Sequence, residues 1–159
     1  MLTEIPTEML DRIDPNSPDW GFWKPIPSIL MDADFARVEN HLNLPLPTIF
    51  KDFLTYRHFV NFQMGDIMLF DNKPSWSFDY LRKVEEYGLV IEGNSLVPFG
   101  ELVDIGLVCF DLRFGEQLIW LNREDGYSYH GKQVLANSLG QLFRQFENNL
   151  FDWKNNLSK

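Results

Sequence analysis

The segment from residue 89 to residue 135 constrains the fold most, because it consists of short apolar runs separated by tight turns. Residues 89–92 and 95–98 flank Gly93 and Asn94, a residue pair typical of a two-residue β-hairpin. Such a turn joins antiparallel strands, and it predicts a hairpin over residues 89–98.

The same texture continues beyond this hairpin. Residues 105–112 and 117–122 are apolar runs on either side of a turn at 113–116, and both are predicted strands. Asp125-Gly126 is a second hairpin signal, and Tyr127 and Tyr129 alternate with polar neighbours in a predicted strand over 127–135. Together these runs predict an antiparallel meander.

Helical spacing appears on both sides of the meander. Apolar residues recur every three or four positions over 32–42, about 47–58, 77–87 and 139–150, with a short strand predicted at 67–70. Ser77 and the Asn137-Ser138 pair can cap two of these helices, and Pro47 suits the first position of another. Helices and a run of hairpin-linked strands predict an α+β fold with helices on one face of a largely antiparallel sheet.

The first 31 residues contain five prolines together with Trp20, Phe22 and Trp23. Proline excludes a long helix, whereas indole rings favour burial, so an extended arm on the domain is predicted. The 159 residues fit one domain, 1–159. Hydrophobic residues make up 45% of the chain and aromatic residues 15%, which excludes a disordered protein.

No apolar run reaches the length of a membrane span, and the acidic N-terminus lacks the pattern of a secretory signal. The single cysteine, Cys109, lies in an apolar strand and cannot form an internal disulfide. We therefore expect a cytoplasmic protein with Cys109 in its core.

The charge predicts the kind of partner. A formal net charge of −9 repels phosphate backbones and anionic lipids and attracts basic proteins. Residues 66–125 carry most of the excess, with 12 acids and 5 bases. We expect a basic protein partner, with no direct binding of nucleic acid or membrane; an ordinary solvated acidic surface is the alternative.

Patterns for catalysis are weak. His41, His58 and His130 lie in separate elements without metal-ligand spacing, and the glycines form no phosphate-binding loop, so neither a metal nor a cofactor is expected. Carboxylates cluster in and around the meander, and a pair of them in a cleft could serve a hydrolase, although turn acids are usually only solvated. This acidic set comprises Glu101, Asp104, Asp111, Glu116, Glu124 and Asp125.

Trp120 and Trp76 differ in what the sequence predicts for them. Trp120 has apolar neighbours on both sides in its strand, which predicts coverage of both faces. Trp76 follows a proline loop and suits either the core or a protein-interaction hot spot.

Several segments between residues 19 and 152 resemble the SMI1/KNR4 (SUKH) superfamily. They read DWGFWKPIPS, a helix containing Glu39 followed by LNLPLPTIFKDFLTYRHF, then SLVPFGELVDIGLVCFDL, IWLN and SLGQLFRQFENNLF. Two places depart from the pattern of many relatives. Arg57-His58-Phe59 stands where they carry Asn-Gly, and Asp104-Ile105-Gly106 stands where they carry adjacent Gly-Asp.

The resemblance implies a mixed, mostly antiparallel sheet and no catalytic activity. Bacterial members of the superfamily resemble immunity proteins that neutralise cognate toxins, often nucleases. On this hypothesis the acidic set, with Trp76, forms the partner-binding face, and its carboxylates mimic phosphates. Two alternatives remain open: a regulatory adaptor in cell-wall synthesis or signalling, as in fungal relatives, and an unrecognised carboxylate-dependent hydrolase.

Overall fold

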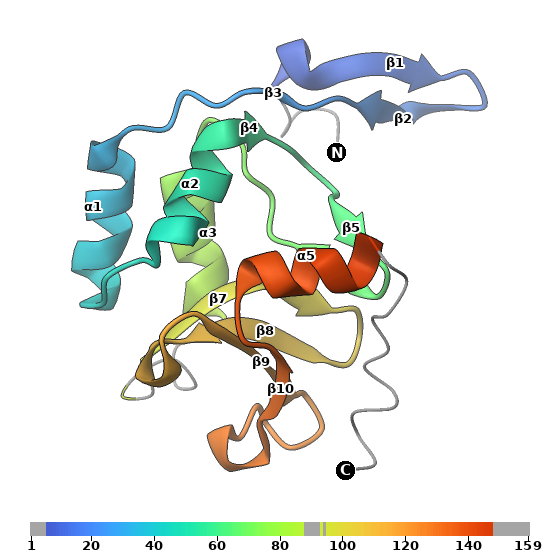
Figure 1. The fold of residues 1–159 in the computed structure, drawn as a ribbon. Helices are drawn as coiled ribbons and strands as arrows, with labels where there is room; N and C mark the ends of the chain where they lie inside the picture. Colours follow the sequence, from blue (N-terminus) through green and yellow to red (C-terminus); the bar gives the residue numbers. More distant parts are fainter. Residues whose placement is uncertain (1–5, 88–92, 94, 148–159) are drawn as a thin grey trace. The chain divides into compact units, whose positions relative to one another are not determined.

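The computed structural model describes residues 6–87, 93 and 95–147, with the backbone alone at residues 19 and 20 (Figure 1). These residues form two compact units that alternate along the sequence. Unit 1 comprises the residues up to Phe62 together with Asp71–Arg82, and unit 2 comprises Gln63–Phe70 and the residues from Lys83 onward. Organisation as one domain stays a prediction.

Unit 1 contains two small antiparallel sheets, β1 with β2 and β3 with β4, together with helices α1, α2 and most of α3. Its elements are the 3-10 turn η2 (Thr7–Met9), β1 (Leu10–Asp14), β2 (Ser17–Trp23), β3 (Ile26–Pro27), α1 (Asp32–Leu42), α2 (Thr48–Tyr56), β4 (Arg57–His58) and α3 (Trp76–Glu85). The predicted helix over 32–42 is confirmed with the same bounds, and those over 47–58 and 77–87 are confirmed with shifted ends. The second ends at Tyr56, because Arg57 and His58 pair with β3.

The proline-rich N-terminal segment forms a hairpin, with Leu10 opposite Trp23 and Ile13 opposite Gly21. Its side chains are only partly covered, since Ile13 and Phe22 are each about half exposed.

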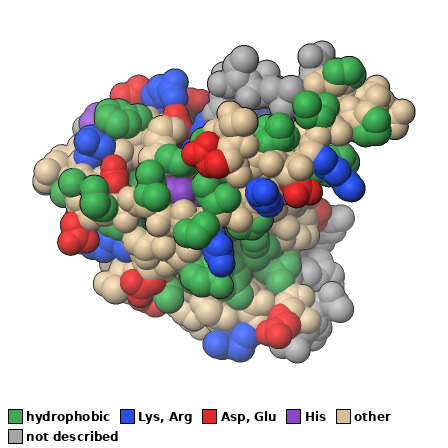
Figure 2. Space-filling view, turned by 90° about the horizontal axis from the view of Figure 1, so that it is seen from above, with side chains coloured by type: hydrophobic (Ala, Val, Ile, Leu, Met, Phe, Trp, Pro, Cys, Tyr) green, Lys and Arg blue, Asp and Glu red, His purple; other side chains and the backbone are tan. Residues whose placement is uncertain are grey.

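Figure 2 shows hydrophobic side chains scattered among acidic and basic ones on one face of the molecule.

Trp76 lies in the aromatic core of unit 1. Its ring stacks on Tyr80 at a centroid distance of 5.0 Å and meets Phe35 edge-to-face at 5.6 Å. Only 1% of the residue is exposed. Its burial corrects the prediction that Trp76 contacts a partner, because the indole that would form a hot spot is already packed.

Buried polar groups join the end of α2 to the segment around residue 72. The side-chain amide of Asn72 donates to the carbonyls of Leu54 and Arg57, at 2.9 and 2.7 Å. His58 is fully buried, with Nδ1 3.0 Å from the carbonyl oxygen of Asn72, while Nε2 accepts a hydrogen bond from the amide of Ile29. This geometry requires a neutral imidazole protonated on Nδ1. Burial lowers the pKa of His58, although its hydrogen bonds to Asn72 oppose the shift.

Unit 2 is built on a six-stranded sheet in the order β10-β9-β8-β7-β6-β5, and every described strand pair in it is antiparallel. The strands are β5 (Gln63–Met64), β6 (Ile67–Leu69), β7 (Leu96–Leu102), β8 (Gly106–Asp111), β9 (Gln117–Asn122) and β10 (Gln133–Ala136), followed by helix α5 (Leu139–Glu147). These elements confirm the α+β class, the meander and the strands predicted at 67–70, 105–112 and 117–122. The expected mixed sheet has no parallel pair among the described residues.

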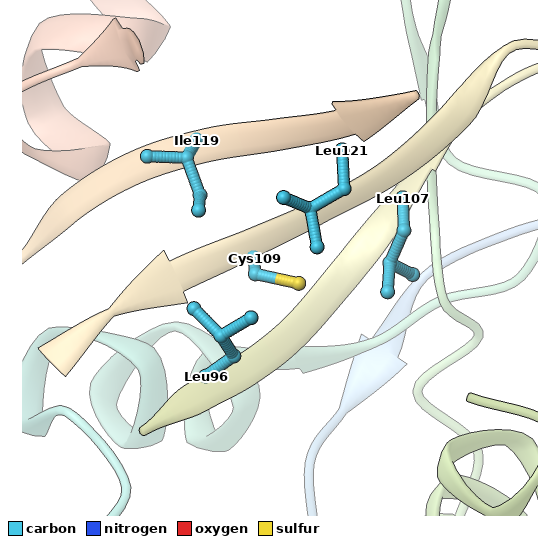
Figure 3. Packing of buried hydrophobic residues seen from close by; sticks show 5 residues of the cluster. All are labelled: Leu96, Leu107, Cys109, Ile119 and Leu121. Carbon is cyan, nitrogen blue, oxygen red and sulfur yellow. The ribbon is translucent and has the colours of Figure 1, made fainter. Parts of the chain in front are cut away.

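Apolar side chains of the central strands β7, β8 and β9 pack together in a buried cluster of unit 2 (Figure 3). It consists of Leu96, Leu107, Cys109, Ile119 and Leu121, all fully buried. The core role of Cys109 is confirmed, and burial raises the pKa of its thiol far above the ordinary value. Trp120, on the same strand as Ile119, is 2% exposed, as its apolar neighbours predicted.

The prediction of a long strand over 127–135 is wrong in its first half. Tyr127 has a left-handed φ of 59°, and its amide donates to the carbonyl of Asn122 in a turn. The 3-10 turn η4 (Tyr129–Gly131) follows, so pairing begins only at Gln133. Tyr127 and Tyr129 pack against the core cluster from these turns, which explains their alternation without a strand.

Two predicted features lie partly outside the described residues. The first is the hairpin at 89–98, of which residues 95–98 fall at Ser95 and the start of β7, whereas 89–92 and 94 are not described. The second is the C-terminal helix, confirmed over α5, with Leu150 not described. Ser138 caps α5, since its hydroxyl accepts from the amide of Gln141.

Candidate functional site: a polar pocket at one end of the sheet

The register of the sheet separates the predicted acidic residues into two groups. Leu102 pairs with Gly106, which pairs with Asn122, so the turns bearing Asp104, Glu124 and Asp125 share one sheet end. Asp111 pairs with Gln117 at the other end of β8, next to Glu116. The two ends lie roughly 17 Å apart along a six-residue strand, so the six predicted acids do not form one patch.

Asp111 is buried and bonds to the segment around residues 129–132. Its side chain is fully buried and accepts hydrogen bonds from the Tyr129 hydroxyl at 2.7 Å and from Lys132 Nζ at 3.0 Å. Although burial disfavours the ammonium, the contacts with Tyr129 and Asp111 raise the pKa of Lys132. The prediction that Asp111 contacts a partner is therefore corrected, because both its surface and its bonding capacity are used internally.

Three loops form what we call the acidic sheet end: residues 65–66, 103–105 and 123–126. Their exposed charged residues are Asp66, Asp104, Arg123, Glu124 and Asp125, four acids and one base. Val103 between them is 43% exposed. A surface of this composition attracts cations and basic proteins.

A pocket of about 340 Å³ opens beside the acidic sheet end, entirely within unit 2. We call it the Glu101 pocket. Its charged lining consists of Lys83, Glu86, Glu101, Asp104 and Arg123, and its aromatic lining of Tyr87 and Tyr127. Polar surface dominates the lining, whereas sites for apolar small molecules are mostly hydrophobic.

Glu101 is the fixed centre of this pocket. Its Oε1 accepts a hydrogen bond from the Tyr87 hydroxyl at 2.5 Å and lies 3.1 Å from Lys83 Nζ. Burial and the hydrogen bond to the Glu101 carboxylate both raise the pKa of Tyr87. Burial lowers the pKa of Lys83, but its contacts with Glu101 and Glu86 outweigh that effect and raise it. The raised pKa values of Tyr87 and Lys83 therefore keep both groups protonated into the alkaline range.

Two residues of the pocket adopt a backbone conformation that non-glycine residues rarely use. Asp104 has a φ of 61° and Tyr127 a φ of 59°. Asp tolerates this region well, whereas a bulky aromatic residue there is an outlier. Outliers of this kind gather at functional sites.

Two carboxylates of the predicted acidic set, Glu101 and Asp104, line the pocket together. Glu101 contacts Lys83 and the Tyr87 hydroxyl. Across the part of the chain that the structure describes, no group of three or more His, Cys, Asp or Glu residues is placed to hold a metal ion.

Sequence reasoning identified Glu101 and Asp104 but missed the rest of the pocket. Lys83 and Tyr87 follow helical spacing near the end of α3, where they read as an ordinary exposed face. Arg123 and Tyr127 flank Glu124 and Asp125 in a turn that was expected to form a hairpin. The end of α3 brings Lys83 and Tyr87 to Glu101, and the sheet register brings the loop of Arg123 and Tyr127 to the same end of the sheet.

The fold and the pocket define an α+β protein that ends its antiparallel meander in an acidic, polar site. A family model described as SMI1-KNR4 cell-wall matches residues 32–140, more than half of the chain, and the protein belongs to this SUKH family. The family includes immunity proteins of polymorphic toxin systems, and its members are generally non-catalytic.

Neither the curated proteins nor the solved structures that were compared contain a match to this chain. None of the described helices combines the length and apolar character that crossing a membrane requires.

The two departures from the family pattern now have structural roles. Arg57 and His58 form β4, and Nε2 of His58 accepts a hydrogen bond from the backbone amide of Ile29. In the other segment, a Cβ at Gly106 would lie 2.2 Å from the carbonyl oxygen of Leu121, so only glycine fits there.

Proposed function

We propose that this protein is an immunity protein that neutralises a cognate bacterial toxin by binding and occluding it. Membership of the SUKH family carries the proposal, since that family includes immunity proteins of polymorphic toxin systems. The protein would act in the cytoplasm, where a toxin aimed at the cell interior has its target, and without chemistry of its own.

Charge supports a basic toxin domain as the partner. The net charge of −9 is concentrated in residues 66–125, and the acidic sheet end exposes Asp104, Glu124 and Asp125 from that segment. Opposite fields accelerate encounter and fix the register of a complex. If the toxin is a nuclease, these carboxylates occupy the places of substrate phosphates.

The proposed binding face is smaller than the acidic set predicted from sequence. It comprises Asp104, Glu124 and Asp125 with the adjoining Glu101 pocket. Trp76 and Asp111 are buried, and Glu116 lies at the opposite end of β8 and β9, so these three are left out.

Co-expression tests the proposal. A toxin domain encoded next to this gene is induced in a sensitive bacterial host with and without this protein. We expect restored growth and a complex that co-purifies. Killing that continues at equal expression of both proteins, without a complex in pull-down, would rule the function out.

A second function has one specific observation in its favour: the description of the matching family model refers to the cell wall. A regulatory adaptor of cell-wall synthesis would bind an enzyme or signalling protein of the host cell. Gene neighbourhood separates the two functions, because an immunity gene adjoins a large toxin gene. Altered wall composition after deletion, with no neighbouring toxin gene, would favour the adaptor.

A further inference from the structure

We propose that the Glu101 pocket receives the guanidinium group of an arginine side chain from the protein partner. This inference deepens the proposed function, on which it rests, by naming the chemistry of one contact. It depends on the charges, the aromatic rings and the fixed geometry of the pocket.

The charged residues that line the pocket carry a net charge of −1, which one cation would neutralise. Lys83 is the only ammonium among them, and it contacts two carboxylates, those of Glu86 and Glu101, at 3.2 and 3.1 Å. Asp104 and Arg123 have no side-chain hydrogen bond or ion pair among the described residues. Three acids against two bases leave the lining with one uncompensated negative charge.

A guest anion is disfavoured by the same geometry. The charge of Lys83 is already offset by two carboxylates, which weakens its attraction for an incoming carboxylate or phosphate. Arg123 offers a guanidinium, but the exposed acids Glu124 and Asp125 follow it directly in the loop. A cation entering beside Asp104 meets a carboxylate that has no side-chain ion pair among the described residues, in a lining that it shares with the Arg123 guanidinium.

The aromatic lining favours arginine over lysine. The Tyr87 and Tyr127 rings meet edge-to-face with centroids 5.3 Å apart and planes at 89°, so they present differently oriented surfaces. A planar guanidinium stacks on a tyrosine face and forms a bidentate ion pair with a carboxylate, whereas an ammonium is a compact, strongly hydrated charge. A volume of about 340 Å³ accommodates one such side chain with its hydration.

The site is set before a partner arrives. Tyr87 and Lys83 hold Glu101 near the C-terminal end of β7, and Asp104 and Tyr127 lie in turns with left-handed backbone conformations. Side chains ordered in advance lose little entropy on binding. The left-handed backbone conformation at Tyr127 places its side chain in the lining of the pocket.

The test is an NMR titration of the full chain with N-acetyl-arginine amide, alongside the uncharged isostere N-acetyl-citrulline amide and the anionic N-acetyl-glutamate amide. We expect saturable shifts of the Leu102, Ile105 and Gly106 amides by the arginine probe. Its dissociation constant should be on the order of 1–10 mM, typical of a single side chain. Citrulline should bind at least about fivefold more weakly.

Matched variants locate the contact. Asp104→Asn preserves the left-handed turn and should weaken the arginine probe roughly three- to fivefold. Glu116→Gln removes the same charge at the far sheet end and should leave binding unchanged. Equal binding of citrulline, tighter binding of glutamate, or shifts confined to other residues would overturn the inference, as would equal effects of the two variants.

Failure of this inference is distinguishable from failure of the proposed function. Protection from the toxin without arginine binding rejects the guanidinium pocket alone. Arginine binding without protection or complex formation rejects the immunity function, while the pocket keeps its specificity.

Discussion

The Tyr87 hydroxyl lies 2.5 Å from Oε1 of Glu101, and this hydrogen bond joins the end of α3 to β7 within unit 2. A second tyrosine, Tyr129, makes the equivalent contact with Asp111 at 2.7 Å. The two acceptors differ in solvent access, since the side chain of Glu101 is 32% exposed and that of Asp111 fully buried.

Removing the two hydroxyls should therefore have unequal costs. Tyr87→Phe is expected to lower the free energy of unfolding by about 1 kcal/mol, because water can solvate Glu101 in its place. Tyr129→Phe should cost about 2 kcal/mol, because the buried carboxylate of Asp111 loses a partner that water cannot replace. Urea denaturation of both variants measures the difference. Equal losses would show that solvent reaches Asp111 as readily as Glu101.

Stability should decline on the acid side because of His58. Its pKa is lowered in the folded protein, mainly by burial, so the unfolded chain takes up the proton first. The contribution is fully present above the unfolded value of 6.5 and is lost as the pH falls below it. As the pH is lowered from 7.5 to 5, the midpoint of denaturation should fall. The variant His58→Gln should show a smaller fall of the midpoint per pH unit.

The matched control for this slope is His130→Gln, since His130 is exposed. It should retain the wild-type pH dependence. If both variants lose the slope, or neither does, then the protonation of His58 does not govern stability in this range.

On the alkaline side, three groups act in the same direction. The pKa values of Tyr87, Lys83 and Lys132 are all raised in the folded state. Burial opposes the shift of both lysines, but the contacts of Lys83 with Glu101 and Glu86, and those of Lys132 with Tyr129 and Asp111, outweigh it. Their contributions are present below the ordinary values of 10.0 and 10.5 and are lost as the pH rises above them. Unfolding midpoints should hence fall above about pH 10, and less steeply in Tyr87→Phe. A midpoint that rises in that range would contradict the geometry of these pairs.

Two glycines should respond to alanine in opposite directions. Gly106→Ala places a Cβ 2.2 Å from the carbonyl oxygen of Leu121 and should cost about 3 kcal/mol through forced separation of β8 and β9. Gly140→Ala in α5 meets the flexible end of Arg144 at 3.6 Å and the Ser138 hydroxyl at 4.0 Å, both ordinary contacts, and it should stabilise the fold by roughly 0.5–1 kcal/mol. Thermal unfolding of both variants is the measurement. A stabilising Gly106→Ala would mean that the strands are farther apart than described.

Sequence patterns predicted the elements whose residues interact locally. The apolar spacing of Phe35 and Val38 identified α1, because burial there follows the helical period. The continuous apolar run at 117–122 identified β9, whose four central residues are all buried. The same logic failed at 127–135. There the tyrosines pack on the core cluster from turns, a tertiary contact that mimics strand alternation.

The candidate site depended on contacts that local patterns do not contain. Glu101 meets Tyr87 14 residues away, and Asp111 meets Lys132 21 residues away. Whether an acid in this segment is buried or exposed depends on the strand register and on such distant partners. Charge counting therefore located the acidic segment without distinguishing Asp104 from Asp111.

The most direct test of the proposed immunity function is the association rate with the cognate toxin domain as a function of ionic strength. The variant Asp104→Asn/Glu124→Gln/Asp125→Asn is compared with Glu8→Gln/Asp11→Asn/Asp52→Asn, which removes the same charge at exposed residues of unit 1. We predict that the first variant lowers the association rate at low salt about tenfold and flattens its salt dependence, while the second changes it little. Equal effects of the two triple variants, or the absence of any complex with the wild-type protein, would contradict the account.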